Sequence, residues 1–273
     1  MKSKLAWGAV LPLLVLLFWE LSAVHADNAA LVPRVGSVAA RLVHPTADLM
    51  GTGSFLRHVA FSVVRVVIGF TLATLLGVPL GLWVGRVERI RHIVNPFVEM
   101  LRPLCPIAWI PFAMAVFKTT TVADLFGFHY TATIFGHLQL GMLFVIFYGG
   151  FFPVFLNTVH GVQSVKHIHI EQALLLGADR RKLFRNVILP SAMPAVLTGL
   201  RVGLGIAWMV IIAAEMMPGS DAGIGYLIMY SYELAEMDVL VASMVWIGVV
   251  GMALSAGLKV FSDRLSFWQA RER

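Results

Sequence analysis

Three arginines stand inside long apolar stretches of the sequence, at Arg65, Arg102 and Arg201. A charge at the centre of a bilayer costs at least about 2.5–3.5 kcal/mol, so such a side chain must face a bundle interior or water, or reach an interface. If the three arginines line one path, the natural ligand of that path is an anion. Glu215 lies near the outer end of the stretch that holds Arg201, and a pair between Arg65 and Glu215 is one expected geometry.

A polar segment, residues 171–190, interrupts the apolar second half of the chain. Gly177 follows an apolar helical stretch and suits a helix C-terminal cap, whereas Asp179 suits the N-cap of a following helix. Pro190 marks the start of the next apolar stretch. Three cations stand where a helix macrodipole disfavours them, so anionic lipid headgroups or an acidic partner surface must favour them: Arg180, Arg181 and Lys182.

The nine histidines and the single cysteine form no catalytic or metal-binding pattern in the sequence. Only His167 and His169 are close neighbours, and a spacing of two places them on different sides of a helix. The sequence contains no H-E-x-x-H or G-x-S-x-G motif, and a lone Cys105 excludes an intramolecular disulfide and a cysteine metal site. We therefore expect no metal and no enzyme, with an intramembrane enzyme as a remote alternative.

The elements that must position these residues are membrane helices. The 273 residues are 59% hydrophobic and 13% charged, with a mean hydropathy of +0.83, whereas soluble domains average about 45–50% apolar and about 25% charged residues. We expect an all-α, polytopic membrane helix bundle. The net charge of +6 reflects Lys and Arg in cytoplasmic loops. No basic patch is interleaved with stacking aromatics, so we expect no nucleic acid.

Six apolar segments reach the roughly 20 residues needed to cross a bilayer. They run over Leu5–Val24, Val59–Gly85, Ile93–Phe117, Leu140–His160, Ser191–Met216 and Leu240–Phe261. The first has an alternative, because Met1–Lys4 and Val24–Ala26 resemble the start and the cleavage site of a secretory signal; its length and two tryptophans favour a retained helix. Residues 25–58 are expected to hold a short surface helix, and 118–139 form a second long outer segment.

Lys and Arg are unevenly distributed between the segments that connect the six spans. With the N-terminus in the cytoplasm, thirteen lie inside and four lie outside, the outside ones being Arg34, Arg41, Arg57 and Lys118. Cytoplasmic loops are enriched in these residues. We therefore expect both termini and the loop 161–190 to be cytoplasmic.

Small residues at helical spacing predict close helix packing in the second and fifth spans. Four glycines of one span and two of the other carry this pattern: Gly69, Gly77, Gly81, Gly85, Gly199 and Gly203. The third span is different, because four prolines interrupt it: Pro96, Pro103, Pro106 and Pro111. A simple kink and a broken helix near a substrate path are both compatible with these prolines.

The polar segment resembles the signature loop of ABC importer permeases. That loop reads Glu-Ala-Ala, three residues, Gly, nine residues and Ile-x-Leu-Pro, and the chain matches it with Glu171, Ala173, Gly177 and Val187–Pro190, while Gln172 replaces an alanine. Five further segments resemble the nitrate, sulfonate, taurine and bicarbonate branch of these permeases: Leu101–Pro111, Leu200–Gly203, Ala207–Trp208, Ala213–Met216 and Gly223–Ile228. The 118–139 segment is longer than is usual for that branch.

The resemblance implies a type I importer fold, with 1–55 as a first helix and periplasmic segment, 56–265 as the permease domain and 266–273 as a cytoplasmic tail. Its coupling loop, 161–190, would dock on a cytoplasmic ATPase through Glu171, Gln172, Ala173, Gly177, Ala178, Asp179, Arg180, Arg181, Lys182 and Pro190. The resemblance also adds Trp109 to the path candidates Arg65, Arg102, Arg201 and Glu215.

The implied partners are two ABC ATPase subunits, a periplasmic or lipid-anchored solute-binding protein, a second copy of this permease and membrane lipids. The chain has no G-x-x-x-x-G-K-[ST] phosphate loop, so ATP and Mg²⁺ are expected on the ATPase and no cofactor on this chain. The implied function is import across a bacterial cytoplasmic membrane by alternating access. The expected solute is nitrate, bicarbonate, a sulfonate or taurine; a riboflavin or pyrimidine precursor or an aromatic acid is the alternative, and a passive channel is a remote one.

Overall fold

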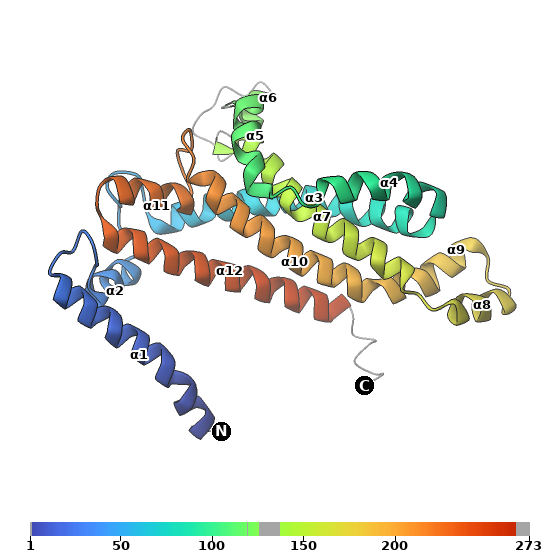
Figure 1. Cartoon of the computed structure of the whole chain (residues 1–273), viewed down its shortest axis with the longest axis horizontal. Helices are drawn as coiled ribbons and strands as arrows, with labels where there is room; N and C mark the ends of the chain where they lie inside the picture. The colour runs from blue at the N-terminus through green and yellow to red at the C-terminus, as the bar shows by residue number, and fades with distance from the viewer. Residues whose placement is uncertain (1, 119, 126–136, 266–273) are drawn as a thin grey trace. The chain divides into compact units, whose positions relative to one another are not determined.

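The computed structural model describes residues 2–118, 120–125 and 137–265 (Figure 1). Throughout these ranges the regular elements are helices, apart from an isolated bridge between Thr121 and Gln139. The all-α prediction is therefore confirmed. The expected tail, 266–273, lies outside the described residues, as do residues 119 and 126–136 of the long outer segment.

The chain divides into two compact units, and unit 1 is formed by Met1–Ser62 and Glu215–Val250. It contains α1 (Lys2–Ala26), α2 (Val35–Val43) and α11 (Ile224–Glu233). It also contains the start of α3 (Phe55–Arg86) and the first half of α12 (Met237–Leu265). Their apolar faces meet in a buried core made of Val38, Leu49, Phe55, Leu227, Val239 and Ala242.

The short surface helix expected within 25–58 is α2, and the structure confirms it. The amide of Val35 donates to the Glu20 carboxylate of α1 at 2.9 Å, which satisfies one of the free amides at the start of α2. The guanidinium of Arg41 lies 2.8 Å from the Asp238 carboxylate of α12. These contacts join residues that are distant in sequence, so they fix α2 within unit 1.

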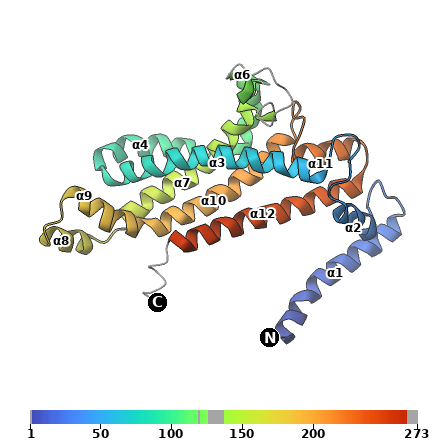
Figure 2. The ribbon, with the colours of Figure 1, turned by 180° about the vertical axis from the view of Figure 1, so that it is seen from behind.

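Unit 2 is formed by Val63–Ala214 and Gly251–Arg273. Besides the remaining turns of α3 and α12 it holds nine further helical segments among the residues that the structure describes. They are α4 (Glu88–Leu101), η1 (Pro106–Ala108), α5 (Trp109–Phe117), α6 (Val122–Leu125), α7 (Leu140–Gln163), α8 (His167–Leu175), α9 (Arg180–Leu183), η3 (Phe184–Ile188) and α10 (Leu189–Glu215). Helix α7 lies between α3 and α10 (Figures 1 and 2), and 61% of its membrane-spanning window is buried, so α7 is the central helix of unit 2.

Glycines of α3 and α10 face α7 at close range. A Cβ on Gly81 would lie 2.6 Å from the Thr158 Cβ and 2.9 Å from the Phe155 carbonyl oxygen, nearer than real side chains approach. The other glycines at this spacing make comparable contacts with α7: Gly69, Gly77, Gly85, Gly199 and Gly203. Helix backbones can approach this closely because no side chain stands between them.

The number of membrane-spanning helices is lower than the sequence predicts. Among the described residues, four stretches are long and apolar enough to cross a membrane, and a bent pair of helices makes a possible fifth; the four are Phe55–Arg86, Leu140–Gln163, Arg180–Glu215 and Met237–Arg264. The prediction of six is therefore wrong. Within α1, the stretch Val10–Ala26 is a shorter apolar helix that is not counted among these spans.

The predicted third span, Ile93–Phe117, is not one straight helix. It is built from α4 and the η1–α5 segment, which meet at a bend of 73°. Pro103 lies in the break and Pro106 begins η1, and each lacks the amide hydrogen that a continuous helix needs. Pro111 lies in the first turn of α5, where the amides have no intrahelical partner. The sequence left two alternatives open for this span, a kinked helix and a broken helix, and the structure shows the broken helix.

Candidate functional site

The loop 161–190 folds as two short helices separated by a sharp turn. Helix α8 ends just before Gly177, which takes a left-handed conformation with φ +77°. The Gly177 amide donates to the Leu174 carbonyl at 2.9 Å and the Ala178 amide donates to the Ala173 carbonyl at 3.0 Å, the paired bonds of a Schellman cap. The predicted glycine cap is confirmed.

Asp179 is the N-cap of the second helix, α9, as the sequence predicts. Its carboxylate accepts a hydrogen bond from the Lys182 amide at 2.7 Å, which satisfies one of the free amides at the helix start. The side chains of Arg180, Arg181 and Lys182 are exposed in this first turn. The negative charge of Asp179 partly offsets the unfavourable meeting of three cations with the helix dipole.

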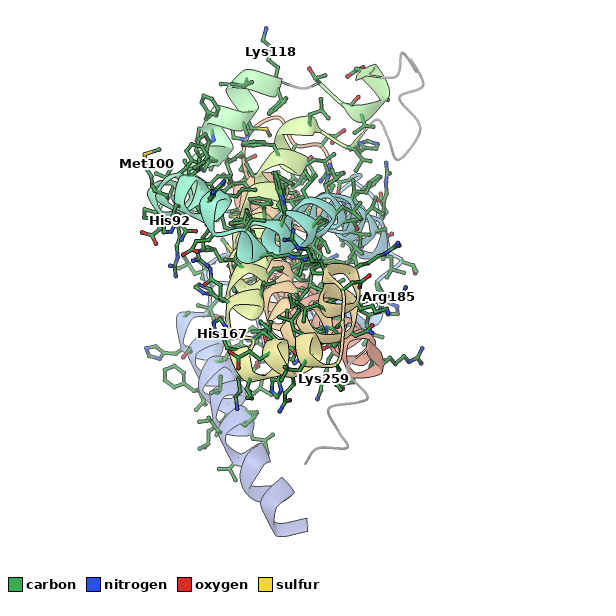
Figure 3. All side chains as sticks on the ribbon, turned by 90° about the vertical axis from the view of Figure 1, so that its right-hand side faces the viewer. His92, Met100, Lys118, His167, Arg185 and Lys259 are labelled. Carbon is green, nitrogen blue, oxygen red and sulfur yellow. The ribbon has the colours of Figure 1, made fainter. Side chains whose placement is uncertain are left out.

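The surface of α8 and its turn carries exposed leucines among polar side chains. Leu175 and Leu176 are 88% and 89% exposed, and Glu171 is exposed on the same helix. Figure 3 views the molecule from the side that carries these helices, and the labelled side chains of His167 and Arg185 project from it. An exposed apolar patch rimmed by polar residues is typical of an interaction site.

Beneath this surface, an apolar cluster joins the loop to the long helices of unit 2. Its buried members come from α7, the loop, η3 and α10: Val162, Val165, Ile188 and Ala192. Arg86, the last residue of α3, donates to the Arg180 carbonyl at 3.3 Å and lies 5.1 Å above the Phe184 ring. The exposed helices are therefore attached to the ends of α3, α7 and α10.

Pro190 lies at the start of α10 and does not interrupt the helix. Proline has no amide hydrogen, so an α-helical bond is missing at this position. The preceding turn, Phe184–Ile188, is a π-helix in which the Leu189 amide reaches the Phe184 carbonyl. The wider turn lets α9 run into α10 as one stretch, Arg180–Glu215, so the helix begins well before the predicted start of the fifth span at Ser191.

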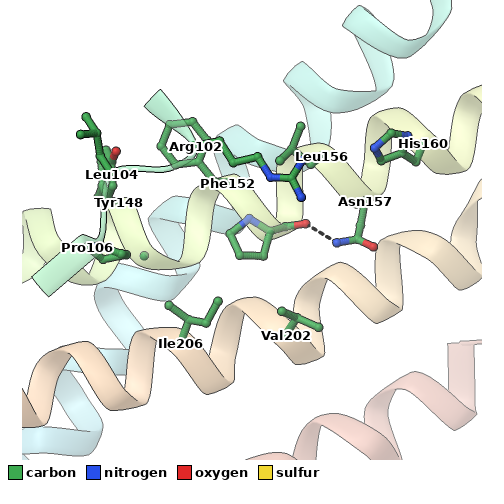
Figure 4. Close-up of a pocket in the computed structure, with 12 residues that line it drawn as sticks. Arg102, Leu104, Pro106, Tyr148, Phe152, Leu156, Asn157, His160, Val202 and Ile206 are labelled. Atoms are coloured by element: carbon green, nitrogen blue, oxygen red, sulfur yellow. Dashed lines mark hydrogen bonds between the residues drawn. The ribbon is translucent and has the colours of Figure 1, made fainter. Parts of the chain in front are cut away.

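A pocket of about 430 Å³ opens inside unit 2, beside the break in the third span (Figure 4). We call it the Arg102 pocket; it is lined by Arg102, Leu104, Pro106, Tyr148, Gly149, Phe152, Pro153, Leu156, Asn157, His160, Val202 and Ile206. Figure 4 shows Arg102, Asn157 and His160 toward one end and Tyr148 and Pro106 toward the other. Irregular backbone between α4 and η1 forms part of the wall, as is usual where a broken helix lines a cavity.

The polar groups of this pocket differ in whether a protein partner already binds them. The Asn157 amide donates to the Pro153 carbonyl at 2.8 Å, and the Tyr148 hydroxyl donates to the Leu101 carbonyl at 3.0 Å. The exposed guanidinium of Arg102 makes no hydrogen bond or ion pair with any residue that the structure describes. None of the lining residues is acidic, so the positive charge is available to a ligand.

Of the five path candidates predicted from the sequence, Arg102 alone lines this pocket. Trp109 of α5 packs on the pocket wall, with its ring centre 5.3 Å from that of Tyr148. Arg201 of α10 donates to the Ser262 hydroxyl at 2.8 Å and lies 3.6 Å from the Asp263 carboxylate. A role for Trp109 and Arg201 on the path stays a prediction.

Arg65 and Glu215 are the two fully buried candidates. Arg65 is 0% exposed and donates to the His137 carbonyl at 2.7 and 3.1 Å. Glu215 is 1% exposed; its carboxylate oxygens lie 2.8 and 2.9 Å from the donating Ser62 hydroxyl, and one accepts from the Gly225 amide at 3.1 Å. The predicted pairing of Arg65 with Glu215 stays a prediction, because the two residues belong to different units.

A buried polar network in unit 1 holds the start of α11, and we call it the Glu215 cluster: Glu215, Ser62, His58 and the backbone of Gly223–Gly225. Ser62 Oγ accepts from the Ile224 amide at 2.9 Å, and His58 Nδ1 accepts from the Gly223 amide at 3.2 Å. The ring proton of neutral His58 is therefore on Nε2, which faces Thr52 Oγ1 at 3.3 Å. The carboxylate thus lies at a helix N-terminus, where free amides favour negative charge.

Glycine is required at position 223. Its φ is +124°, and a Cβ there would overlap the Glu215 carboxylate. Tyr226, in the first turn of α11, stacks on His58 with ring centres 6.1 Å apart. Burial raises the pKa of the Tyr226 phenol above its ordinary value, and three neighbours add to the shift, namely Tyr230, Asp221 and Glu233. The phenol therefore stays neutral around this cluster at physiological pH.

Five polar side chains of these two sites are not among the sequence-predicted ones: Tyr148, Asn157, His160, Ser62 and His58. Asn157 and His160 follow Pro153 at the spacing of one helix face, so polar residues on one side of an apolar helix were a usable signal. Ser62 follows His58 by one turn, but its partner Glu215 is 153 residues away, and no local pattern reports that contact.

Comparison with known proteins agrees with this architecture. Residues 77–270 match the family described as binding-protein-dependent transport system inner membrane component. The chain is 41% identical over 259 residues to a Methanocaldococcus jannaschii chain described as an ABC transporter permease protein, covering 95% of this chain and 90% of that one. It is 28% identical over 263 residues to the taurine transport system permease protein of Escherichia coli, covering 94% and 87% of the two chains. Over 232 residues it is 30% identical to the bicarbonate transport system permease protein of Synechococcus elongatus, covering 84% and 74%.

The family match covers most of the chain, from within α3 through α12, and so includes the Arg102 pocket, the exposed loop and the start of α11. The apolar helices make the protein an integral membrane protein. The function of this chain is therefore inferred from the family to which it belongs, and not from a set of catalytic residues. The chain belongs to the family of binding-protein-dependent transport system inner membrane components, and it is a permease subunit of an ABC importer.

Proposed function

We propose that this permease carries a small anion into the cytoplasm. The observation that supports an anion most directly is the Arg102 guanidinium, which no described residue pairs and which faces a pocket without acidic side chains. An intramembrane cation is costly unless a counter-charge or water reaches it, so a negatively charged solute stabilises this site. The relatives named for taurine and bicarbonate support the same class, because each of these solutes carries an ionised acidic group at neutral pH.

The loop 161–190 is the proposed docking site for the ATPase. Leu175 and Leu176 supply apolar anchors, and three exposed cations supply electrostatic contact: Arg180, Arg181 and Lys182. The caps at Gly177 and Asp179 fix the angle between α8 and α9. ATP and Mg²⁺ bind to the ATPase in this proposal, and this chain binds no cofactor.

The proposed orientation places both termini and the loop 161–190 in the cytoplasm, as the distribution of Lys and Arg favours. A second copy of the permease completes the path, and two ATPase subunits bind from the cytoplasm. A periplasmic or lipid-anchored binding protein delivers the solute from the other side. Membrane lipids surround the exposed apolar faces of the long helices.

The proposed mechanism is alternating access. ATP binding draws the ATPase subunits together, and α8 and α9 follow them. Because Arg86 and the apolar cluster attach these helices to α3, α7 and α10, the long helices that line the Arg102 pocket move as well. Coupling requires that nucleotide and solute bind with different affinity to the two states, and such coupling is typically worth about 1–3 kcal/mol.

ATP-driven uptake of labelled anions into proteoliposomes that contain the permease, the ATPase and the binding protein tests this proposal. Gly177→Asp and Glu171→Lys should abolish uptake without loss of protein from the membrane, because each places the wrong charge in the interface with the ATPase. Gly177→Asn is the matched control and should retain uptake. Asn has the shape of Asp and tolerates a left-handed conformation, and nothing lies within 4 Å of a Cβ at this position.

Two outcomes contradict the proposal in different ways. Normal uptake by both Gly177→Asp and Glu171→Lys shows that the loop does not couple the permease to the ATPase. Failure of the wild-type complex to take up nitrate, bicarbonate, alkanesulfonate or taurine, with ATP hydrolysis intact, shows that the solute is not a small anion.

A further inference from the structure

The Arg102 pocket has a charged end and an apolar end, and this division points to a particular kind of anion. We propose that the pocket is a solute-binding site of the permease itself, and that it selects organic anions with a short apolar body over bare inorganic oxoanions. The proposal rests on the function proposed above, because it names the binding site and the substrate class within small-anion import.

The charged end supplies donors that suit an acidic head group. Arg102 presents a planar guanidinium with five N–H donors, and no described residue occupies them. Asn157 uses one amide hydrogen for the Pro153 carbonyl and keeps a second. His160 adds a ring nitrogen at the same end (Figure 4). A sulfonate or carboxylate can accept from all three side chains.

The rest of the pocket offers nothing that an inorganic oxoanion can use. Phe152 of α7 and Val202 and Ile206 of α10 present apolar surface, and Val202 and Ile206 are one helical turn apart on the same face. The Tyr148 hydroxyl already donates to the Leu101 carbonyl. Water beside such walls gains few hydrogen bonds, so an apolar body that displaces it stabilises the complex.

The size of the pocket agrees with its chemistry. A volume of about 430 Å³ lies within the range of small-molecule sites, roughly 300–1,000 Å³. A water molecule takes up about 30 Å³ of liquid, so a four-atom oxoanion leaves most of this pocket filled with water. An anion with a few methylene groups fills the space between Arg102 and Ile206 more completely.

The consequence is a second selection step besides the binding protein. Each methylene that becomes fully buried raises affinity by up to about fourfold. In a complex of permease and ATPase without the binding protein, affinity should therefore rise along methanesulfonate, ethane-1-sulfonate and butane-1-sulfonate. Nitrate should bind at least about tenfold more weakly than butane-1-sulfonate, and neutral butan-1-ol should show no saturable binding.

Isothermal titration of that complex in lipid nanodiscs measures this series. Arg102→Gln should weaken every anion by about tenfold or more, since a hydrogen-bonded charge is removed, and Arg102→Lys should retain part of the affinity. Ile206→Thr should flatten the dependence on chain length and leave nitrate unchanged. Arg91→Gln is the control for charge and should bind as wild type, because Arg91 lies on α4 outside the pocket and pairs with Glu88 at 3.5 Å.

Three results would overturn the inference: nitrate binding as tightly as butane-1-sulfonate, no detectable anion binding without the binding protein, or an unchanged affinity series in both Arg102→Gln and Ile206→Thr. None of them touches the proposed function, which stands as long as the complete transporter takes up an anion at the expense of ATP. Loss of that uptake for every anion tested refutes the proposed function and this inference together.

Discussion

The Glu215 cluster of unit 1 and the Arg102 pocket of unit 2 both place polar side chains among apolar helices, and they differ in how far their hydrogen-bonding groups are satisfied. In the cluster, Glu215, Ser62 and His58 are each 1% exposed or less, and backbone amides of the α11 start donate to all three. In the pocket, Arg102 is exposed and no described residue accepts a hydrogen bond from its guanidinium.

The difference separates a structural role from a binding role. A buried polar group without partners costs about 1–3 kcal/mol, so a buried network persists when it is satisfied and then specifies one arrangement of the chain. Donors that remain available in an open cavity contribute nothing to folding and are available to a solute. Removal of the charge is therefore expected to lower the stability of the protein at Glu215, and to lower the affinity for a solute at Arg102.

The largest effect is expected at Gly223. Gly223→Ala forces a side chain into a φ of +124° and displaces the Glu215 carboxylate, which then loses its bonds to Ser62 and Gly225. Backbone strain of this kind costs about 1–3 kcal/mol and each broken buried bond about as much, so we expect a loss of more than about 3 kcal/mol. Unfolding of the purified permease in a titration with SDS measures this loss.

Gly219→Ala is the control for backbone strain. Gly219 also has a positive φ, +97°, but nothing lies within 4 Å of a Cβ at that position. Its substitution should cost about 1–2 kcal/mol, the price of a left-handed conformation alone. An equal loss in Gly219→Ala and Gly223→Ala would show that the overlap with Glu215 does not matter.

Glu215→Gln should be next in size. The substitution keeps the shape of the side chain but replaces one acceptor oxygen with an NH₂ group and removes the negative charge at the start of α11. We expect a loss of about 2–3 kcal/mol in the same SDS titration. Stability equal to wild type would mean that the carboxylate is not the acceptor that holds α11.

Ser62→Ala should be smaller, because it removes the two hydrogen bonds of a neutral hydroxyl and leaves the carboxylate in place. The Ile224 amide then loses its acceptor at 2.9 Å, while Glu215 keeps the Gly225 amide. A single buried donor without a partner predicts a loss of about 1–2 kcal/mol. The double variant Ser62→Ala with Glu215→Gln should cost less than the sum of the two, since both act on one network; strict additivity would argue against a shared network.

The features predicted from sequence are those whose causes are local. Helix α7 was expected at Leu140–His160 and is found at Leu140–Gln163, because its apolar run ends where the polar loop begins. The caps at Gly177 and Asp179 depend on residues within five positions of one another, so turn chemistry was sufficient to predict them. The break between α4 and α5 was one of two readings of the prolines, and only packing decides between a kink and a bend of 73°.

The two polar sites depend on contacts that local patterns do not report. Arg102 and Glu215 were both chosen as charges inside apolar stretches, and the same reasoning gave them the same role. Their environments differ because a residue far along the chain binds one of them: Ser62 donates to Glu215 across 153 positions, whereas no described residue pairs with the Arg102 guanidinium. The third span was predicted as one continuous segment for a related reason, since hydropathy alone does not reveal where a helix bends.

The smallest effect on stability is expected at Arg102, and it is the sharpest test of the comparison. Arg102→Gln removes one charge and keeps a polar side chain of moderate length, as Glu215→Gln does in the other unit. No described residue loses a hydrogen bond or an ion pair, so the free energy of unfolding should change by no more than about 0.5 kcal/mol. Anion affinity should fall in the same variant. If Arg102→Gln instead destabilises the permease as strongly as Glu215→Gln, the guanidinium has a structural partner, and satisfaction of hydrogen bonds does not distinguish the binding site from the structural cluster.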